Sequence, residues 1–507
     1  MRRPNILLVT ADQWRGDCLG VAGHPVVKTP TIDRLAAEGT VFLRHYAQAA
    51  PCGPSRASLY TGLYQMNHRV VRNGTPLDRR HDNIALAMAR LGYRPTLFGY
   101  TDQAVDPREV SADSPWLRTY EGILPGFEAR VHLPEYPEAW LRWLSWRGAE
   151  VPASHWELFV PPSGPTRRPG AAPPRYGADE TPAAFLTGAF IDWLGEQDPG
   201  TPWFAHVSYI APHPPFVVPE PYNRAYSPSS GPAFRRAPSR AAEGRVHPAV
   251  LYWLAQADGQ HFVLGADPIS GWDSRDFGTV RAVYWGMISE VDAQIGRAMD
   301  AIAAAGMADD TIVVFTSDHG EMLGDHWALG KFGYFEQAFH VPLVVHDPRR
   351  EGGREVGDFT EAVDILPTVL ALAGGTPPGH VDGRSLVPFL DGAVPAGWRD
   401  AVHFEFDFRE VASGVAQRMF GLDLDSCSLA VRRDARYKYV HFAGLPPLLF
   451  DLEDDPDEVI DRSGDPAYAA VRLDCAERLL AWRARHLDRT WTGVELTPIG
   501  LVDGRRP

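Results

Sequence analysis

Short runs of consecutive apolar residues recur along the first three quarters of the chain, separated by stretches of helical periodicity. Such runs are typical of parallel strands buried on both faces, because each row of side chains then meets a layer of helices. The predicted strands span 5–11, 40–46, 95–100, 202–210, 311–316 and 341–346, and the predicted helices span 29–39, 83–91, 182–197, 276–305 and 360–373. This alternation predicts an α/β fold in which helices flank a doubly wound, mostly parallel sheet.

The pattern changes after about residue 386. Strand-like segments at 401–406, 428–432 and 437–442 follow one another without helices between them, and one helix is predicted over 466–486. This order is typical of an α+β module with an antiparallel sheet. We therefore predict a large catalytic α/β domain over residues 1–385 and a smaller C-terminal α+β subdomain over 386–507, which ends in an extended tail.

Two long stretches, at 102–181 and 219–274, are rich in proline and lack a clear periodicity. Irregular segments of this length in a compact enzyme usually cover a functional site or form mobile loops. We expect both stretches to be irregular.

Composition narrows the possible functions. The 507 residues carry a net charge of −15, which makes nucleic acid a poor partner. The four cysteines lie far apart in the sequence, so neither a disulfide framework nor a cysteine zinc site is expected. The N-terminal apolar run is too short for a signal peptide or a membrane span. We expect a cytoplasmic protein that does not bind membranes.

One segment combines a nucleophilic side chain with groups that bind anions. It reads Cys52-Gly53-Pro54-Ser55-Arg56, and Pro54 predicts the first turn of a helix. Cys52 then lies just ahead of a helix N-terminus, where backbone N–H groups and the helix dipole favour an anion, and Arg56 adds a guanidinium. This arrangement indicates attack on an anionic ester. The alternative is an ordinary buried cysteine where a loop meets a helix.

Two adjacent pairs of polar residues follow predicted strands. Asp12 and Gln13 come after the strand at 5–11, and Asp318 and His319 come after the strand at 311–316. Because parallel strands place their carboxyl ends at one edge of a sheet, these side chains can converge on one cation. Oxygen ligands suit Mg²⁺, Ca²⁺ or Mn²⁺, and the imidazole favours Mn²⁺. We predict one divalent metal ion, with Mn²⁺ as the first choice.

The spacing Cys-x-Pro-Ser-Arg at 52–56 resembles the sulfatase signature, and other segments extend the resemblance over almost the whole chain. They are 10–15 (TADQWR), 62–69 (GLYQMNHR), 318–321 (DHGE), 405–409 (EFDFR), 437–442 (YKYVHF) and 446–452 (PPLLFDL). Together they look most like the phosphonate monoester hydrolases, a formylglycine-dependent branch of the alkaline phosphatase superfamily related to arylsulfatases. Many sulfatases resemble this site with a second Asp where Gln13 stands and Asn where His319 stands.

The resemblance implies a mechanism. In this family the cysteine that matches Cys52 is oxidised to formylglycine by a formylglycine-generating enzyme, and the aldehyde works as its hydrate. One hydroxyl attacks phosphorus or sulfur, and loss of a proton from the other rebuilds the aldehyde and expels the bound group. Residue 52 would also contact the metal ion held by Asp12, Gln13, Asp318 and His319.

Further residues are assigned by their match to the family. Arg56, His213 and Lys331 match catalytic residues, and His213 is the expected proton donor to the leaving group. Asn73 and Tyr100 match residues of the substrate pocket, with Asn73 expected on a non-bridging oxygen of the substrate.

One position departs from the family pattern. Asp102 stands where a pocket threonine is expected, and a carboxylate there would repel an anionic substrate unless it points away.

The resemblance predicts a hydrolase of phosphonate monoesters and phosphate diesters with promiscuous activity on sulfate esters. One alternative is an arylsulfatase with the same machinery, and a remote one is a non-catalytic oligomeric binding protein that kept the fold. The substrate is expected to be a small anionic ester.

A homotetramer is also expected, because relatives in this branch look like tetramers with C-terminal arms. The tail carries apolar residues without a pattern that would bury them locally, namely Trp491, Val494, Leu496, Ile499 and Leu501.

Overall fold

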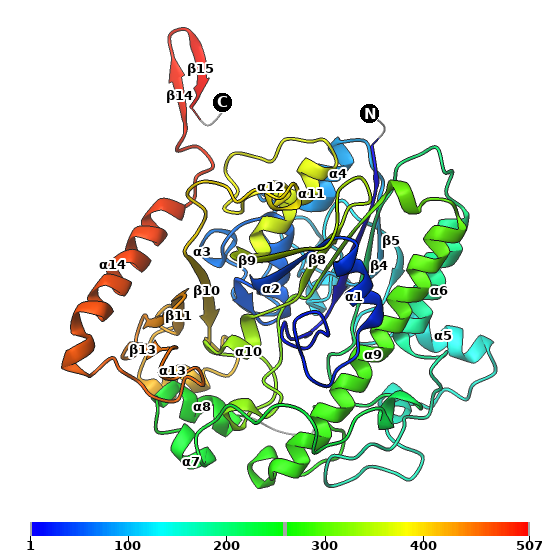
Figure 1. The fold of residues 1–507 in the computed structure, drawn as a ribbon, viewed down its shortest axis with the longest axis horizontal. Helices are drawn as coiled ribbons and strands as arrows, with labels where there is room; N and C mark the ends of the chain where they lie inside the picture. The colour runs from blue at the N-terminus through cyan, green and yellow to red at the C-terminus, as the bar shows by residue number, and fades with distance from the viewer. Residues whose placement is uncertain (1–2, 257–260, 505–507) are drawn as a thin grey trace.

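An eight-stranded sheet lies at the centre of the protein, in the order β5-β4-β6-β1-β7-β8-β2-β9 (Figure 1). The computed structural model describes residues 3–256 and 261–504. The strands are β1 (Asn5–Ala11), β2 (Thr40–Tyr46), β4 (Pro95–Gly99), β5 (Glu128–His132), β6 (Phe204–Tyr209), β7 (Thr311–Thr316), β8 (Leu343–His346) and β9 (Arg354–Glu361). Strand β8 runs antiparallel to both of its neighbours, and the other pairs are parallel. The predicted mostly parallel sheet is confirmed.

Helices cover both faces of this sheet (Figure 1). One layer contains α1 (Pro30–Ala37), α5 (Glu138–Trp146), α6 (Pro182–Gly195) and α9 (Ser274–Ala304), and the other contains α2 (Cys52–Thr61), α4 (Ile84–Arg90), α11 (Ile365–Leu372) and α12 (Val387–Leu390). On β1, Leu7 and Val9 pack toward the first layer, whereas Ile6 and Leu8 pack toward the second. Successive residues of a strand point to opposite faces, so both rows of the apolar run are buried.

A second, five-stranded sheet forms the C-terminal part, in the order β13-β12-β11-β10-β3. It consists of β10 (Ala401–Asp407), β11 (Ser428–Asp434), β12 (Tyr437–Phe442) and β13 (Leu448–Asp451), to which β3 (Ala49–Ala50) adds a parallel edge. Helix α14 (Ala469–His486) packs on this sheet through Leu479 and Trp482. The predicted α+β character is confirmed.

The chain ends in a hairpin of β14 (Val494–Thr497) and β15 (Gly500–Asp503), which projects from the body (Figure 1). The expected absence of strand structure in the tail is therefore wrong. Its two strands have four residues each, which is too short for a reliable alternating pattern.

Several other elements differ from the sequence prediction. The stretches predicted to be irregular contain β5, α5, α7 (Arg240–Glu243) and α8 (Pro248–Gln256). The remaining short helices are α3 (Gln65–His68), α10 (Glu336–Phe339) and α13 (Val415–Phe420). The helix predicted over 360–373 begins only at Ile365, because the preceding residues end β9 and turn. Helix α2 begins at Cys52, two residues before the predicted Pro54.

In the described part of the chain, every helix is too short or too polar to span a membrane.

Candidate active site

The carboxyl ends of β1 and β7 bring four of the predicted site residues together. The two strands are parallel neighbours, so Asp12 and Asp318 leave the sheet at the same edge, and α2 begins there with Cys52. One ligand atom from each of Asp12, Cys52, Asp318 and His319 lies within 4.8 Å of the other three. All four side chains are buried. We call these four residues the metal-binding cluster.

The imidazole of His319 presents an unprotonated nitrogen to this cluster. Its Nδ1 lies 3.1 Å from the backbone oxygen of Gly320, and a carbonyl oxygen can only accept, so Nδ1 carries the proton. Its Nε2 lies 3.7 Å from Asp12 Oδ1 and 3.8 Å from Asp318 Oδ2. Burial lowers the pKa of His319, which keeps the ring neutral. This is the tautomer and charge state of a histidine that binds a metal ion.

The cluster therefore fits a divalent cation. The two carboxylates and the neutral imidazole form a mixed oxygen and nitrogen set of the kind expected for such an ion, and unmodified Cys52 adds a thiol sulfur. The amide oxygen of Gln13 accepts from Lys331 Nζ at 2.5 Å. An amide oxygen has two lone pairs, so this contact leaves Gln13 able to bind the same ion.

The guanidinium of Arg56 donates hydrogen bonds to both aspartates of the cluster. Its Nε donates to Asp318 Oδ2 at 2.8 Å, its Nη2 donates to Asp12 Oδ2 at 3.2 Å and its Nη1 donates to Ser208 Oγ at 2.9 Å. The side chain is 1% exposed, and Arg56 is absent from the described residues that line the cavity. These hydrogen bonds hold the carboxylates of Asp12 and Asp318 in place.

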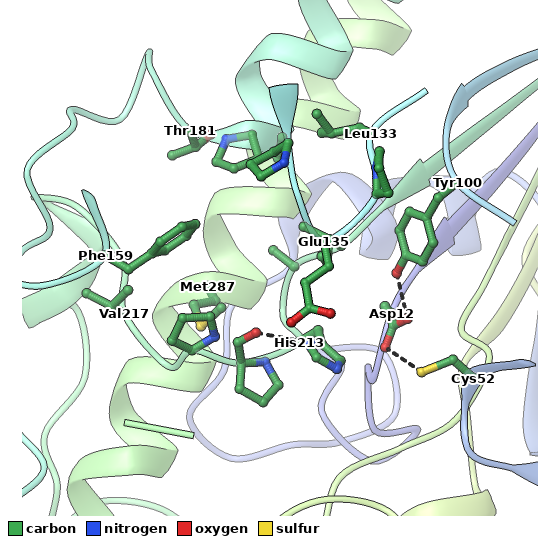
Figure 2. A pocket seen from close by; sticks show the side chains of 18 of the residues that line it. Asp12, Cys52, Tyr100, Leu133, Glu135, Phe159, Thr181, His213, Val217 and Met287 are labelled. Atoms are coloured by element: carbon green, nitrogen blue, oxygen red, sulfur yellow. Dashed lines mark hydrogen bonds between the residues drawn. The ribbon is translucent and has the colours of Figure 1, made fainter. Parts of the chain in front are cut away.

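The hydroxyl of Tyr100 forms hydrogen bonds with both Asp12 and Arg56. Its hydroxyl donates to Asp12 Oδ2 at 2.6 Å and accepts from Arg56 Nη2 at 3.1 Å (Figure 2). Its ring lies against the Arg56 guanidinium, with the centroid 4.3 Å from Cζ. Tyr100 borders the cavity as predicted, but its hydroxyl is engaged in orienting Asp12.

Glu321 is a site residue to which the sequence analysis gave no role. Its carboxylate accepts from Gln13 Nε2, and it also accepts from the backbone N–H of Leu323 at 3.0 Å and of Gly330 at 2.6 Å. The Gln13 amide is thus held between Glu321 on one side and Lys331 on the other. Glu321 belongs to the DHGE segment, so the motif contained the signal, but a sequence does not show that its partner is Gln13.

A cavity of about 140 Å³ opens beside the metal-binding cluster. Cys52, Asn73, His213 and Lys331 line it, together with Asp12. Figure 2 labels Asp12, Cys52 and His213 at this site. The five come from segments far apart in the sequence, and the structure places them along one cavity.

Two of the lining residues are oriented by backbone groups. The Oδ1 of Asn73 accepts from Gly53 N at 2.8 Å, so its amide nitrogen is the group left for a substrate oxygen. His213 Nδ1 lies 2.8 Å from the carbonyl oxygen of Pro214, which leaves Nε2 for chemistry. Burial, followed by the charge of Lys331, lowers the pKa of His213 to about 3.

Asp102 lies beside the predicted substrate site. It borders the cavity, and its Oδ2 is 4.0 Å from Arg56 Nε. Burial raises its pKa well above the ordinary value, and a neutral carboxyl group does not repel an anion. The expected repulsion is thereby reduced.

The thiol of Cys52 is a poor nucleophile in its unmodified form. Its Sγ lies 3.1 Å from His319 Nε2, and the side chain is buried at the first turn of α2. Burial and the charge of Asp12 raise its pKa well above the ordinary value, so the metal-free protein holds a thiol rather than a thiolate.

Comparison with known proteins agrees with this geometry. The Sulfatase family model matches residues 4–375, and the model for the C-terminal part of N-sulphoglucosamine sulphohydrolase matches residues 324–485. The multifunctional alkaline phosphatase superfamily protein PehA of Trinickia caryophylli is 42% identical over 512 residues, covering 99% of each chain.

Solved structures are similar over the full length. The phosphonate monoester hydrolase of Agrobacterium radiobacter is 55% identical, with a TM-score of 0.97 and full coverage of both chains. The phosphonate monoester hydrolase of Silicibacter pomeroyi is 39% identical, with a TM-score of 0.94 and full coverage of both chains. With a family match over most of the chain and a full-length relative above 40% identity, this protein belongs to the sulfatase family of ester hydrolases.

Proposed function

We propose that the protein hydrolyses phosphonate monoesters and phosphate diesters, with formylglycine at position 52 as the nucleophile and sulfate esters as secondary substrates. The observation that carries the proposal is the presence of two cavities that share His213 and Lys331 in their lining. The first is the cavity beside Cys52. The second has a volume of about 370 Å³ and is lined by aromatic residues such as Trp253 and Phe408. A phosphodiester or phosphonate monoester has two organic substituents to place, whereas a sulfate monoester has one.

The cofactors have defined positions in this proposal. Asp12, Asp318, His319 and residue 52, with Gln13 beside them, would hold one divalent metal ion. When bound, such an ion supplies positive charge that polarises substrate oxygens and stabilises the charge that develops on them. Formylglycine would be produced by a formylglycine-generating enzyme and would supply the attacking hydroxyl of its hydrate.

The chain's own residues supply binding and proton transfer. Lys331 and the amide nitrogen of Asn73 bind the non-bridging oxygens. Neutral His213 carries its proton on Nδ1, so Nε2 first takes a proton from solvent water and then gives it to the leaving oxygen. An anionic ester beside Nε2 raises the pKa of the imidazole, which makes His213 a proton donor when substrate is bound.

The charge of the cavity supports a preference for monoanions. Among the described residues, Lys331 is the only lysine or arginine that lines it, because Arg56 is engaged with the aspartates. A phosphate monoester brings nearly two negative charges to the reacting centre, and an unmatched charge in a dry site is costly. We therefore expect the order phosphonate monoester and phosphodiester, then sulfate ester, then phosphate monoester.

Matched nitrophenyl esters test this proposal. The protein is produced together with a formylglycine-generating enzyme, and kcat/KM is measured for one ester of each of the four classes. A higher value for the phosphate monoester would contradict the charge argument. The highest value for the sulfate ester would support the second candidate, an arylsulfatase, which the match to the Sulfatase family model also favours.

The nucleophile has a separate test. Mass spectrometry of the peptide that contains residue 52 should show loss of sulfur and two hydrogens and gain of one oxygen. The variant Cys52→Ser should lose turnover, because serine has no second hydroxyl to expel the bound group. Full activity in protein that carries only unmodified Cys52 would contradict the mechanism.

We also propose a homotetramer in which the C-terminal hairpin packs on a neighbouring copy. Leu496, Ile499 and Leu501 are 83%, 94% and 58% exposed on this hairpin. An isolated two-stranded hairpin is marginally stable in water, and a protruding apolar surface of this kind is typical of a protein interface.

A further inference from the structure

The cavity continues past the reacting centre into a part that both acidic and aromatic side chains line. We call this part the outer arm, and its lining residues are Tyr120, Glu121, Glu135, Trp156, Phe159 and Tyr176. Figure 2 shows the carboxylate of Glu135 projecting into the cavity, between the apolar side chains around Phe159 and Met287 and the imidazole of His213. The outer arm is thus continuous with the place where the ester reacts.

Glu135 has no cation partner in the described part of the chain. It forms no ion pair and its carboxylate accepts no hydrogen bond there, whereas its backbone N–H donates to Glu121 Oε1. Burial, and then the charge of Glu135, raises the pKa of Glu121 to about 7. His155 is electrostatically close to Glu135, but burial lowers its pKa, so it is neutral. Glu135 therefore gives the outer arm a carboxylate without a cation partner among the described residues.

Asp102 adds a third carboxyl group at the inner end of the outer arm. Its side chain is 5% exposed, and its carboxyl group accepts no hydrogen bond from any described residue. The one cation near it is Arg56, at 4.0 Å, which the metal-binding aspartates already engage. Because Asp102 borders the cavity, a bound ligand can donate a hydrogen bond to its carboxyl group.

A carboxylate such as Glu135, in a cavity proposed to bind anions, is better suited to a positively charged group than to a second anion. A wholly anionic substrate would be repelled by Glu135, whereas an ammonium group on one substituent would be attracted. Aromatic rings bind alkylammonium groups through their faces, and cages of this kind recognise quaternary ammonium ions. Tyr120, Trp156 and Tyr176 provide such rings in the same cavity.

We propose that the outer arm binds an ammonium-bearing substituent of the phosphate diester or phosphonate monoester, with Glu135 as the anionic contact and the aromatic side chains as the cage. This inference rests on the proposed function. An ammonium group also favours the ionised form of Glu121, so that binding would draw a second carboxylate into the contact.

Two chromogenic diesters test the inference directly. One is the nitrophenyl phosphodiester of choline, and the other is that of 3,3-dimethylbutanol, in which carbon replaces the choline nitrogen. The two substituents match in size and shape, so a difference in kcat/KM reports on the positive charge. We expect the choline ester to be preferred roughly tenfold, which corresponds to a cation bound by a ring and a partly exposed carboxylate.

Substitutions identify the residue responsible. Glu135→Gln should lower kcat/KM for the choline ester and raise it for the neutral ester, because the amide neither attracts the cation nor repels the phosphate. The preference should then fall below about threefold. Glu138→Gln is the matched control, because Glu138 pairs with Arg142 and lies outside the cavity. It should leave both values unchanged.

The possible failures are distinguishable. Equal kcat/KM for the two esters in the unsubstituted enzyme would overturn the inference while leaving the proposed function intact. An undiminished preference in Glu135→Gln would overturn the assignment to the outer arm. If neither diester is hydrolysed, the proposed function fails and the inference fails with it.

Discussion

Asp318 connects the metal-binding cluster to its support. Its Oδ2 accepts from Arg56 Nε at 2.8 Å, and its Oδ1 accepts from the backbone N–H of Gln13 at 3.1 Å and of His319 at 2.9 Å. One carboxylate therefore fixes the guanidinium and the backbone of two predicted ligands. A neutral side chain of the same shape keeps most of these contacts but loses the charge.

The variant Asp318→Asn should lose metal and activity. Removal of one of two anionic ligands weakens the hold on a dication, and kcat should fall by about two to three orders of magnitude with it. Metal content by elemental analysis and kcat on an aryl phosphodiester measure the effect. Asp325→Asn is the control, because Asp325 is also buried and paired with arginines but lies outside the cluster. Equal metal content in Asp318→Asn and the parent would contradict the ligand assignment.

The buried side chain of Glu290 makes the free energy of unfolding depend on pH. It accepts from Thr181 Oγ1 and Gln294 Nε2, and burial raises its pKa to about 7 from the ordinary 4.5. Between these values the folded state keeps a proton that the unfolded state has lost. Stability therefore falls as pH rises from about 4.5 to 7, and the cost persists above 7.

Glu290→Gln should remove that cost, which is on the order of 3 kcal/mol. The variant should gain in melting temperature relative to the parent at pH 8, and should gain little at pH 5. Glu157→Gln, at an exposed position, serves as the control and should follow the parent at both values. If the difference in melting temperature between Glu290→Gln and the parent is the same at pH 5 and pH 8, the assignment is wrong.

The sequence predicted the site residues that follow regular elements. Asp12 and His319 could be found because each follows a buried strand, and Cys52 could be found from its spacing to Arg56. The partners of Arg56 and Tyr100 could not, because hydrogen bonds between segments depend on the packed geometry. Glu135 also could not be predicted, because it lies in a proline-rich stretch without a clear hydrophobic periodicity.

At the scale of elements, β4 and β6 approach closely where they carry site residues. Gly99 ends β4 with φ of +113°, and a Cβ placed there would lie 2.2 Å from the backbone oxygen of Ser208 in β6. Ser208 in turn accepts from Arg56. The absence of a side chain at position 99 therefore sets the distance between two strands that support the metal-binding carboxylates.

Gly99→Ala should cost about 3–5 kcal/mol, because it combines backbone strain with overlap against a strand that cannot move freely. Denaturant unfolding measures the loss, and activity should fall with it as Ser208 shifts. Gly188→Ala in α6 is the control, since a Cβ there meets no atom within 4 Å. It should stabilise the protein by about 0.5–1 kcal/mol. Equal stability of the two variants would contradict the argument.

The strands and long helices of the main fold could be predicted because their apolar patterns are continuous. Strands β1 and β7 and helix α9 stand close to their predicted positions. The direction of β8 could not be predicted, because a four-residue apolar run carries no information on its neighbours. Helix α5 was missed, although its apolar residues have helical spacing, because prolines and tryptophans surround it.

At the scale of the whole molecule, the C-terminal hairpin is the contact proposed to hold the tetramer together. A chain that ends at Asp488 should form smaller particles than the full chain, because the hairpin that would bind a neighbour is gone. Light scattering measures the mass, and Ile499→Asp should act in the same direction. Val411→Asp is the control, since Val411 is 74% exposed elsewhere on the surface. An unchanged mass in the truncated chain would contradict the proposed interface.

The two-residue strand β3 has a consequence for the order of events during synthesis. It lies directly before Cys52 and pairs with β10, which the ribosome makes much later. Once β10 is in place, residues 49–50 are fixed in a sheet and the thiol is only 4% exposed. Any enzyme that converts Cys52 while bound to the chain around it must act before then. At ordinary rates of translation that interval lasts on the order of tens of seconds, and the proposed conversion of Cys52 would have to occur within it.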